Sequence, residues 1–443
     1  MTSALGALVR VGLAAVFAAF AACGHGGSAG PRARPTTPPV ARAAIAADGG
    51  LSDAAPAAAE PPAPEIHHVL GTGQSLSIGV GGGPALTFEQ PFDNLMFRTG
   101  VMAGRRDLDA LMPLVEGDFV PGTEVPTETM SSAFANLASD GGRHRILVSI
   151  HGAGAFPYAK LRKGTRPYET GLLQVAAARD LARRDGRGYV VTAVTNVHGE
   201  SDHAEKNTSY GRDLIEWQAD VEADVRALTG QRQPVPMLHS QMSSWTRMMK
   251  GTETSAIPQA QLDASIASSG KLVLVGPKYH LPYARDGVHL SNEGYRHMGE
   301  DYAKAYRRVV VERGAWEPLR PVSVRAAGAT IDVTFSVPAP PLVLDTDLVT
   351  NPGNHGFEYT DDSAAPPSIA NVELTGTDTV RISLAGVPRA GARRLRYAFT
   401  GTKGARSGPA SGARGNLRDS DSTPSRHGYA LYNWCVHFDI AVP

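Results

Sequence analysis

The sequence predicts a three-layer α/β domain built on a parallel sheet, followed by a small antiparallel β-sandwich. The first observation is length, because 443 residues exceed what one hydrophobic core usually supports. The second is that short apolar runs rich in β-branched residues alternate with segments of helical spacing as far as about residue 313. The third is that only strand-like patterns and Pro- and Gly-rich turns follow Gly314.

Apolar runs in the first part predict five buried strands, at residues 67–70, 145–150, 189–197, 235–239 and 271–275. Helical spacing separates several of these runs. It is clearest where Leu214, Trp217 and Val221 share one face of a helix that ends at Gly230. Strands that alternate with helices in this way form a parallel sheet that is covered on both faces.

A last helix of this part is expected from about Ser291 to Arg313, with Ser291 as its N-terminal cap. Its apolar and aromatic residues recur at spacings of three and four, which indicates a stripe that faces the core. Beyond it, alternating patterns predict strands at residues 330–337, 372–374, 379–384, 394–399 and 429–442. Trp434 and Phe438 are expected to pack in the core or between domains.

The N-terminus has the features of an export signal, with a positive charge at Arg10, an apolar run at 11–22 and small residues before Cys23. The run is too short to span a bilayer. Phe20-Ala21-Ala22-Cys23 resembles a bacterial lipoprotein cleavage box, so Cys23 is the expected lipidation site and ordinary secretion is the alternative. The expected location is therefore the bacterial cell envelope, at the outer membrane or cell surface, or the medium.

Four segments follow from these patterns. Residues 1–22 are expected to be a lipoprotein-type signal peptide, and 23–64 a disordered tether rich in Ala, Pro and Gly. Residues 65–313 are expected to form the α/β domain, and 314–443 the β-sandwich domain.

Charge and cysteine content exclude several classes of function. Lys plus Arg and Asp plus Glu both number 43, so no net field favours nucleic acid or an anionic membrane. Membrane contact is expected only through the N-terminal lipid anchor. The two cysteines form no redox pair or zinc knuckle, and the histidines at 67–68 and 198–203 lack the His-Glu-x-x-His spacing of a zinc site. The sequence therefore predicts neither a metal nor a cofactor.

Two polar motifs lie where an α/β sheet exposes its carboxyl edge. The first strand runs into Gly71-Thr72-Gly73-Gln74-Ser75, and a serine at a strand exit near a helix start can act as a nucleophile or simply as a cap. Asp286 lies three residues before His289, immediately ahead of the last helix. A short turn there would let the carboxylate hold one imidazole nitrogen while the other faces Ser75, the arrangement that acyl transfer requires.

A third motif, Gly199-Glu200-Ser201-Asp202, follows the strand at 189–197. Together with Gly-Gln-Ser after the first strand and Asp-x-x-His before the last helix, it resembles the ordered blocks of the SGNH (GDSL) hydrolases. The resemblance covers about 65–313 and is strongest to the carbohydrate esterase branch that includes sialate O-acetylesterases. It implies a flavodoxin-like, three-layer SGNH hydrolase domain.

By position, the resemblance implies Ser75 as nucleophile, His289 as general base and then acid, and Asp286 as the residue that orients His289. It also implies an oxyanion hole formed by the backbone of Ser75, by Gly154 with Gly152 as an alternative, and by His198, where the family commonly has glutamine. His198 could instead contact substrate or pack. Glu200 and Asp202 are expected to brace neighbouring loops.

The expected function is therefore a serine ester hydrolase that removes acyl groups, with acetyl favoured, from an acylated carbohydrate or another small ester through an acyl-serine intermediate. An α/β-hydrolase fold is less favoured, because its Gly-x-Ser-x-Gly elbow is not completed at Ser77. Two alternatives stay open: a lipase-like or polyester esterase on the same triad, and a catalytically inactive glycan-binding protein of the cell surface.

Overall fold

The computed structural model describes residues 66–120, 123–139, 144–389 and 391–443. The expected signal peptide, the lipidation site Cys23 and the tether lie outside these residues. Within the described ranges, no helix combines the length and the hydrophobicity needed to cross a membrane.

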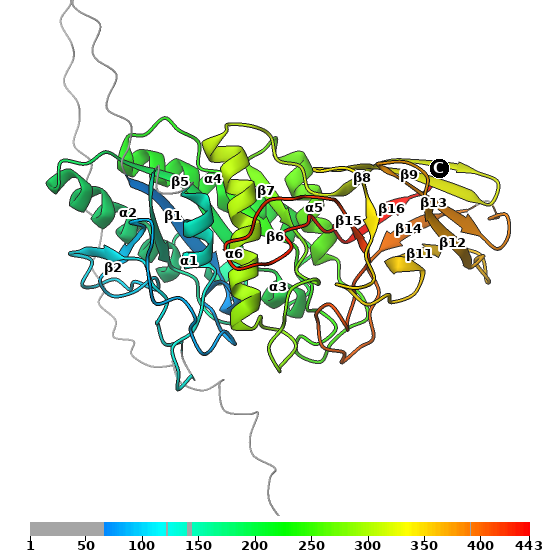
Figure 1. Cartoon of the computed structure of the whole chain (residues 1–443), viewed down its shortest axis with the longest axis horizontal. Coiled ribbons are helices and arrows are strands. Elements are labelled where there is room, and N and C mark those ends of the chain that lie inside the picture. The colour runs from blue at the N-terminus through cyan, green and yellow to red at the C-terminus, as the bar shows by residue number, and fades with distance from the viewer. Residues whose placement is uncertain (1–65, 121–122, 140–143, 390) are drawn as a thin grey trace, which may run out of the picture. The chain divides into compact units, whose positions relative to one another are not determined.

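The first part of the described chain is built on a seven-stranded sheet (Figure 1) with the order β3-β2-β4-β1-β5-β6-β7. Its strands are β1 Ile66–Gly73, β2 Leu95–Phe97, β3 Leu111–Pro113, β4 Arg145–Ile150, β5 Tyr189–Val197, β6 Met237–Ser240 and β7 Leu272–Gly276. Every neighbouring pair is parallel except β2 and β3. The five strands predicted from sequence are confirmed. The short edge strands β2 and β3 are unpredicted, because three residues carry too little pattern to detect.

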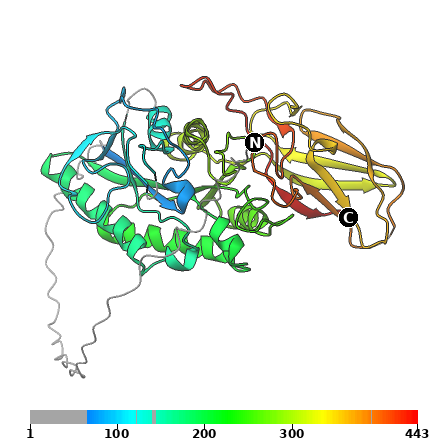
Figure 2. The same ribbon diagram turned by 90° about the horizontal axis from the view of Figure 1, so that it is seen from below.

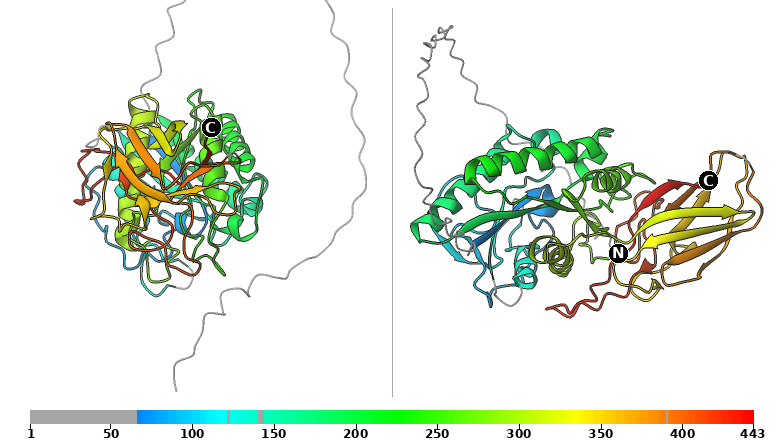
Figure 3. Two further views of the ribbon diagram at one scale, coloured as in Figure 1. Left: turned by 90° about the vertical axis from the view of Figure 1, so that its right-hand side faces the viewer. Right: turned by 90° about the horizontal axis from the view of Figure 1, so that it is seen from above.

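Helices cover both faces of this sheet, which confirms the three-layer prediction. The helices are α1 Ser131–Ala138, α2 Arg166–Arg184, α3 Glu200–Ala204, α4 Tyr210–Thr229, α5 Ile257–Ala267 and α6 Asn292–Tyr306. One core cluster holds the buried apolar residues of α6 and most of those of α1. A second holds those of α4, most of those of α5, and Tyr168 and Val175 of α2, while the rest of α2 packs in a third cluster with residues of β1 and β4. Figures 2 and 3 show the long helices α2 and α4 side by side along one face. A π-helical turn, Arg307–Val311, extends α6.

Strand β1 lies at the point where the strand order changes direction. Its neighbours are β4 on one side and β5 on the other, and the chain passes from β1 to β4 and then back across to β5. Loops diverge at such a switch point, which leaves a crevice at the carboxyl ends of the strands where ligands bind in open α/β sheets. The loop after β1 therefore holds a favoured position for a functional site.

The chain after residue 314 folds into antiparallel sheets, as predicted. They are a four-stranded sheet β12-β13-β9-β8, a three-stranded sheet β11-β14-β16 and a two-stranded pair β10-β15. The strands are β8 Arg320–Ala327, β9 Thr330–Ser336, β10 Val343–Leu344, β11 Phe357–Thr360, β12 Ile369–Leu374, β13 Thr379–Leu384, β14 Arg394–Tyr397, β15 Leu417–Arg418 and β16 Phe438–Ala441. The inner faces of the four- and three-stranded sheets share one hydrophobic core.

The predicted strand at 429–442 is wrong over most of its length, because only Phe438–Ala441 forms a strand. The preceding segment returns to the α/β part and lies along α6 (Figure 1). There Tyr429 stacks on His297, and the ammonium group of Lys304 donates to the carbonyl of Leu431. Residues 433–437 are all buried because this segment packs between two parts of the molecule, not because it pairs in a sheet.

Candidate active site

Ser75 lies directly beyond β1, at the start of a single 3-10 turn, Ser75–Ser77. The chain enters this turn through Gly73, whose φ of +123° favours glycine, and a Cβ there would lie 2.3 Å from the carbonyl oxygen of Val197. The side chain of Gln74 points back into the protein, where its Oε1 accepts a hydrogen bond of 2.9 Å from the Ser201 amide. These contacts place the Ser75 hydroxyl at the carboxyl edge of the central strand.

The structure brings Ser75, His289 and Asp286 together in one hydrogen-bonded series. The Ser75 Oγ lies 2.8 Å from Nε2 of His289, and Nδ1 of the same ring lies 2.5 Å from Oδ2 of Asp286. The other carboxylate oxygen of Asp286 accepts from the backbone N–H groups of Val288 and His289, at 2.9 and 3.0 Å. The turn between acid and base is closed by Gly287, which has a φ of +72°.

The electrostatics of this series favour an ionised Asp286. Partial burial raises the pKa of its carboxyl, but the hydrogen bond and charge of His289 and the two backbone N–H groups outweigh that effect and lower the pKa to about 2. The carboxylate is thus charged at neutral pH and orients His289 with Nδ1 as donor. In that tautomer Nε2 is free to accept the proton of Ser75.

The loop after β4 supplies the third side of the site. A Cβ on Gly154 would lie 4.0 Å from the Cβ of Ser75 and would meet nothing nearer, so the backbone of Gly154 borders open space beside the serine. A Cβ on Gly152 would instead lie 2.2 Å from the Ser77 Oγ and 2.8 Å from the Gly73 carbonyl oxygen. Gly152 is therefore closely packed between loops, whereas Gly154 has open space beside it next to Ser75.

The expected oxyanion role of His198 is not supported by its surroundings. Its side chain is buried; Nδ1 lies 2.8 Å from the Tyr210 hydroxyl, and Nε2 lies 3.0 Å from the carbonyl oxygen of Phe156. Both ring nitrogens thus have partners inside the protein, so neither is available to an oxyanion. Burial lowers the pKa of His198, and the nearby Asp202 only partly opposes this effect. The packing alternative raised from sequence fits this arrangement.

The motif at 199–202 stabilises the loops next to the site through buried hydrogen bonds. Asp202 accepts from the Tyr158 amide at 2.9 Å and from the Asn207 side chain at 2.7 Å. Glu200 is fully buried, accepts from the Ser244 hydroxyl at 3.2 Å and lies 3.5 Å from the ammonium group of Lys278. Sequence reasoning missed Lys278, since nothing in the local pattern marks a lysine whose charge is fully buried.

The antiparallel part also contacts the turn that carries the acid and base. Ser407 donates its backbone N–H to the carbonyl of Gly287 at 3.0 Å, and Arg406 lies directly over the same glycine. Arg247 bridges the two parts, since its Nε donates to the Asp286 carbonyl at 3.1 Å and its Nη1 to that of Gly404 at 3.4 Å. These long-range contacts were also missed, because no sequence motif spans them.

No model of a known protein family matches this sequence, and no curated protein matches it either. Among solved structures, XAC1771, described as a novel carbohydrate acetylesterase from Xanthomonas citri, is similar with a TM-score of 0.55 at 12% identity, over 85% of this chain and 80% of that one. NanS has a TM-score of 0.40 at 14% identity, over 56% of this chain and 99% of that one. Est24, a carbohydrate acetylesterase from Sinorhizobium meliloti, has a TM-score of 0.31 at 14% identity, over 54% and 97%.

The similarity to XAC1771 confirms the predicted fold, a three-layer α/β domain with antiparallel sheets after it. The similarity spans both parts of the described chain, because the α/β part alone is too short to account for 85% of the chain.

Proposed function

We propose that this chain is a serine ester hydrolase that removes acetyl groups from a carbohydrate or another hydroxylated substrate. The observation that carries the proposal is the hydrogen-bonded series from Ser75 through His289 to Asp286 at the carboxyl edge of the central strand. The choice of acetyl and sugar rests on the fold that the chain shares with XAC1771, a protein described as a carbohydrate acetylesterase. One fold can act on many substrates, so the experiment below tests the substrate separately from the triad.

The acylation step uses all three side chains. Ser75 Oγ attacks the ester carbonyl carbon while Nε2 of His289 takes its proton, and the carbonyl oxygen becomes an oxyanion. The backbone N–H groups of Ser75 and Gly154 would stabilise this oxyanion. His289, now positive and held by the Asp286 carboxylate, returns the proton to the sugar oxygen as the C–O bond breaks. The products are the free hydroxyl and an acetyl-Ser75 ester.

Deacylation repeats the same chemistry with water in place of the alcohol. His289 accepts a proton from the attacking water, the oxyanion forms again in the same site, and collapse expels Ser75 Oγ, which regains the proton from His289. Acetate leaves and the resting state is restored. No group beyond the triad, the backbone donors and water is needed to balance these steps.

The test compares hydrolysis of an aryl acetate, a long-chain aryl ester and acetylated oligosaccharides by the wild-type chain, Ser75→Ala and Ser77→Ala. Ser75→Ala should lower kcat by about 10⁴-fold or more, because it removes the nucleophile. Ser77→Ala is the matched control two residues away; its hydroxyl donates to the Gln74 carbonyl at 2.7 Å. That loss of one neutral hydrogen bond, about 1 kcal/mol, should change kcat less than tenfold.

Each outcome bears on a different part of the proposal. Acetyl-selective turnover that Ser75→Ala abolishes supports the whole of it. A preference for the long-chain ester would replace the acetyl-sugar substrate with a lipase-like or polyester one on the same triad. Absence of turnover on all three esters would favour a glycan-binding role, and equal turnover by Ser75→Ala would remove Ser75 as nucleophile.

Export as a lipoprotein is part of the same proposal and rests on the sequence alone. Residues 1–22 would be removed, Cys23 would carry the lipid, and residues 23–64 would hold the catalytic part away from the membrane. Fractionation of cells that express the wild type and Cys23→Ser tests this. The wild type should sediment with membranes, and detection of both proteins in the soluble fraction would argue for ordinary secretion.

A further inference from the structure

We propose that His280, His297 and Asp301 form a structural zinc site that ties helix α6 to the loop after β7. Nitrogen or oxygen atoms of these three side chains all lie within 4.8 Å of one another, and they form the one such group among the residues that the structure describes. His297 and Asp301 are four residues apart on α6 and share one face of the helix. His280 comes from the segment that leads to Asp286 and His289.

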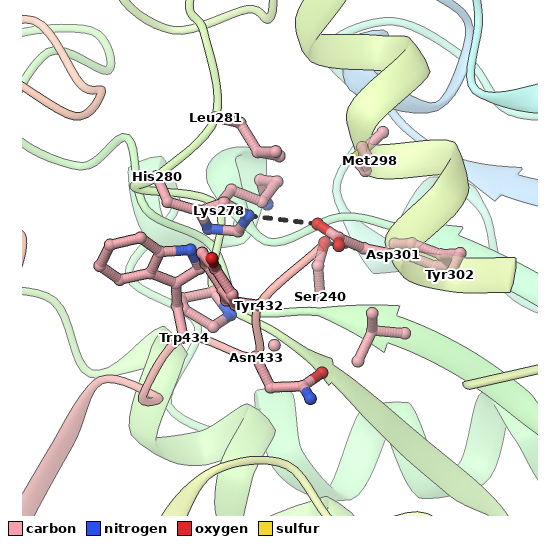
Figure 4. Close-up of a pocket in the computed structure, with 13 residues that line it drawn as sticks. Ser240, Lys278, His280, Leu281, Met298, Asp301, Tyr302, Tyr432, Asn433 and Trp434 are labelled. Atoms are coloured by element: carbon pink, nitrogen blue, oxygen red, sulfur yellow. Dashed lines mark hydrogen bonds and ion pairs between the residues drawn. The ribbon is translucent and has the colours of Figure 1, made fainter. Parts of the chain in front are cut away.

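The distances suit a tetrahedral ion. His280 Nε2 lies 3.1 Å from Asp301 Oδ2, and their side chains are 5% and 13% exposed. Two ligands bound to Zn²⁺ at 2.0–2.2 Å at a tetrahedral angle are roughly 3.3 Å apart, so this pair already has the required separation. Because the three ligand atoms lie within 4.8 Å of one another, binding would require the widest separation to close by up to roughly 1.5 Å. Figure 4 shows the imidazole of His280 and the carboxylate of Asp301 facing each other.

Several polar atoms of this group are buried and lack a partner among the described residues. They are Nδ1 of His280, Nε2 of His297 and Oδ1 of Asp301. Buried nitrogen and oxygen atoms are nearly always paired, so three orphans on adjacent side chains require an explanation. A metal ion bound by Nε2 of His297, Nε2 of His280 and Oδ2 of Asp301 would give Nε2 of His297 its partner.

Neighbouring aromatic rings hold both imidazoles in place. His280 stacks on Trp434 with ring centroids 5.7 Å apart, and His297 stacks on Tyr429 at 4.8 Å. The His297 ring also donates a hydrogen bond to the backbone carbonyl of Ala430. Metal-binding histidines are commonly oriented by such a bond from the second ring nitrogen, which leaves the other nitrogen for the ion.

Space for a fourth ligand is present beside the group. A cavity of about 20 Å³ is lined by Ser240, Lys278, His280, Met298, Asp301 and Trp434. That volume holds one water molecule, which would complete four-coordination. The nearby ammonium group of Lys304 does not compete for Asp301, since it lies 3.0 Å from Asp421 and donates to Leu431 and Asn433.

Two neutral imidazoles, one carboxylate and one water form a borderline set of nitrogen and oxygen ligands, which favours Zn²⁺ over Ca²⁺ or Mg²⁺. The ligands come from two segments, so the sequence carries no compact zinc motif. The ion would fix the loop between β7 and α6, which carries Asp286 and His289. The site stands independently of the proposed hydrolase activity, and its test does not use activity.

The test measures metal binding by the untagged full chain after treatment with a chelator and dialysis. Titration with ZnCl₂ should show one ion bound per chain, and addition of Zn²⁺ should raise the melting temperature. Co²⁺ in the same site should give the visible absorption of a four-coordinate ion without the near-ultraviolet band of a cysteine ligand. His297→Gln and Asp301→Asn should each weaken zinc binding by about 100-fold or more, because loss of even an outer-shell partner of a metal ligand costs roughly 10- to 100-fold. His355→Asn is the control, since that half-buried histidine lies in the antiparallel part.

Failure to bind Zn²⁺ with one-to-one stoichiometry, or binding that both variants retain, would overturn the site. Should either variant fail to fold, the spectrum of the wild-type chain with Co²⁺ still decides. Four-coordinate absorption without a sulfur band supports the site, and the spectrum of hydrated six-coordinate Co²⁺ overturns it.

Discussion

Asp286→Asn isolates what the carboxylate does in the proposed mechanism. The amide has the same shape, and its oxygen could still accept from the backbone N–H groups of Val288 and His289, which the carboxylate holds at 2.9 and 3.0 Å. The NH₂ group would then face Nδ1 of His289, where Oδ2 accepts at 2.5 Å in the native chain. Nδ1 would have to accept instead of donate, so the proton would move to Nε2. In that tautomer His289 cannot take the proton of Ser75.

The structure gives different sizes for the effects on stability and on rate. The fall of the Asp286 pKa from 3.8 to about 2 corresponds to about 2 kcal/mol. The side chain is 49% exposed, so solvent screening reduces this contribution to stability to about 1 kcal/mol. The wrong tautomer, in contrast, should lower kcat by about 10³- to 10⁴-fold, or about 4–5.5 kcal/mol in the activation free energy.

The assay combines kcat and KM on an aryl acetate with urea unfolding of both proteins. A large fall in kcat, an unchanged KM and a loss of about 1 kcal/mol in the free energy of unfolding would support the assigned role. The reasoning fails if kcat stays within tenfold of the wild type. It also fails if the fall in activity tracks a loss of folded protein.

Three further outcomes are expected. Gly154→Pro removes the backbone N–H beside Ser75 and should lower kcat by about 10²- to 10³-fold. Gly154→Ala keeps the N–H, and its new Cβ would lie 4.0 Å from the Cβ of Ser75, so most activity should remain. Equal kinetics for the two variants would exclude this N–H as an oxyanion donor. Lys278→Met leaves the buried Glu200 carboxylate without its cation and should destabilise the fold by about 3–5 kcal/mol in urea unfolding. Adding Glu200→Gln should recover much of the lost unfolding free energy. No recovery would show that the pair does not act as a unit. The pKa of Asp286 is lower in the folded state, so its stabilising contribution is present above about pH 4 and is lost as the pH falls towards 2. The difference in unfolding free energy between the wild type and Asp286→Asn should therefore shrink over that range. A difference independent of pH would contradict the lowered pKa.

Local patterns were sufficient for the main strands and for the fold class. The runs at 145–150 and 189–197 match β4 and β5 to the residue, because fully buried parallel strands are continuous apolar runs with clear ends. The edge strands β2 and β3 were missed, since their three residues form a strand only through pairing with neighbours. The segment 429–437 was wrongly predicted as a strand for a related reason: its apolar residues contact α6 and the antiparallel part and do not pair in a sheet.

The candidate site was likewise predictable from the sequence in part, and the rest depends on the folded structure. Ser75, Asp286 and His289 could be proposed from sequence because each belongs to a short motif at a strand or helix end. Their hydrogen-bonded arrangement, and the preference for Gly154 over Gly152, depend on how the loops after β1 and β4 pack. His198 was expected at the oxyanion because its motif adjoins the site, but Tyr210 and the carbonyl of Phe156 occupy both ring nitrogens.

The sequence alone determines the order of the elements, the three-layer class of the first part and the residues that could carry acyl transfer, because hydrophobic period and short motifs act over a few residues. The tertiary structure decides which of these side chains meet and which charges are buried. It joins Arg247 and Ser407 to the Asp286 turn, pairs Lys278 with Glu200, and gathers His280, His297 and Asp301. Such contacts join residues between 4 and 120 positions apart, and their energies depend on burial and direction, which exist only once the chain has folded.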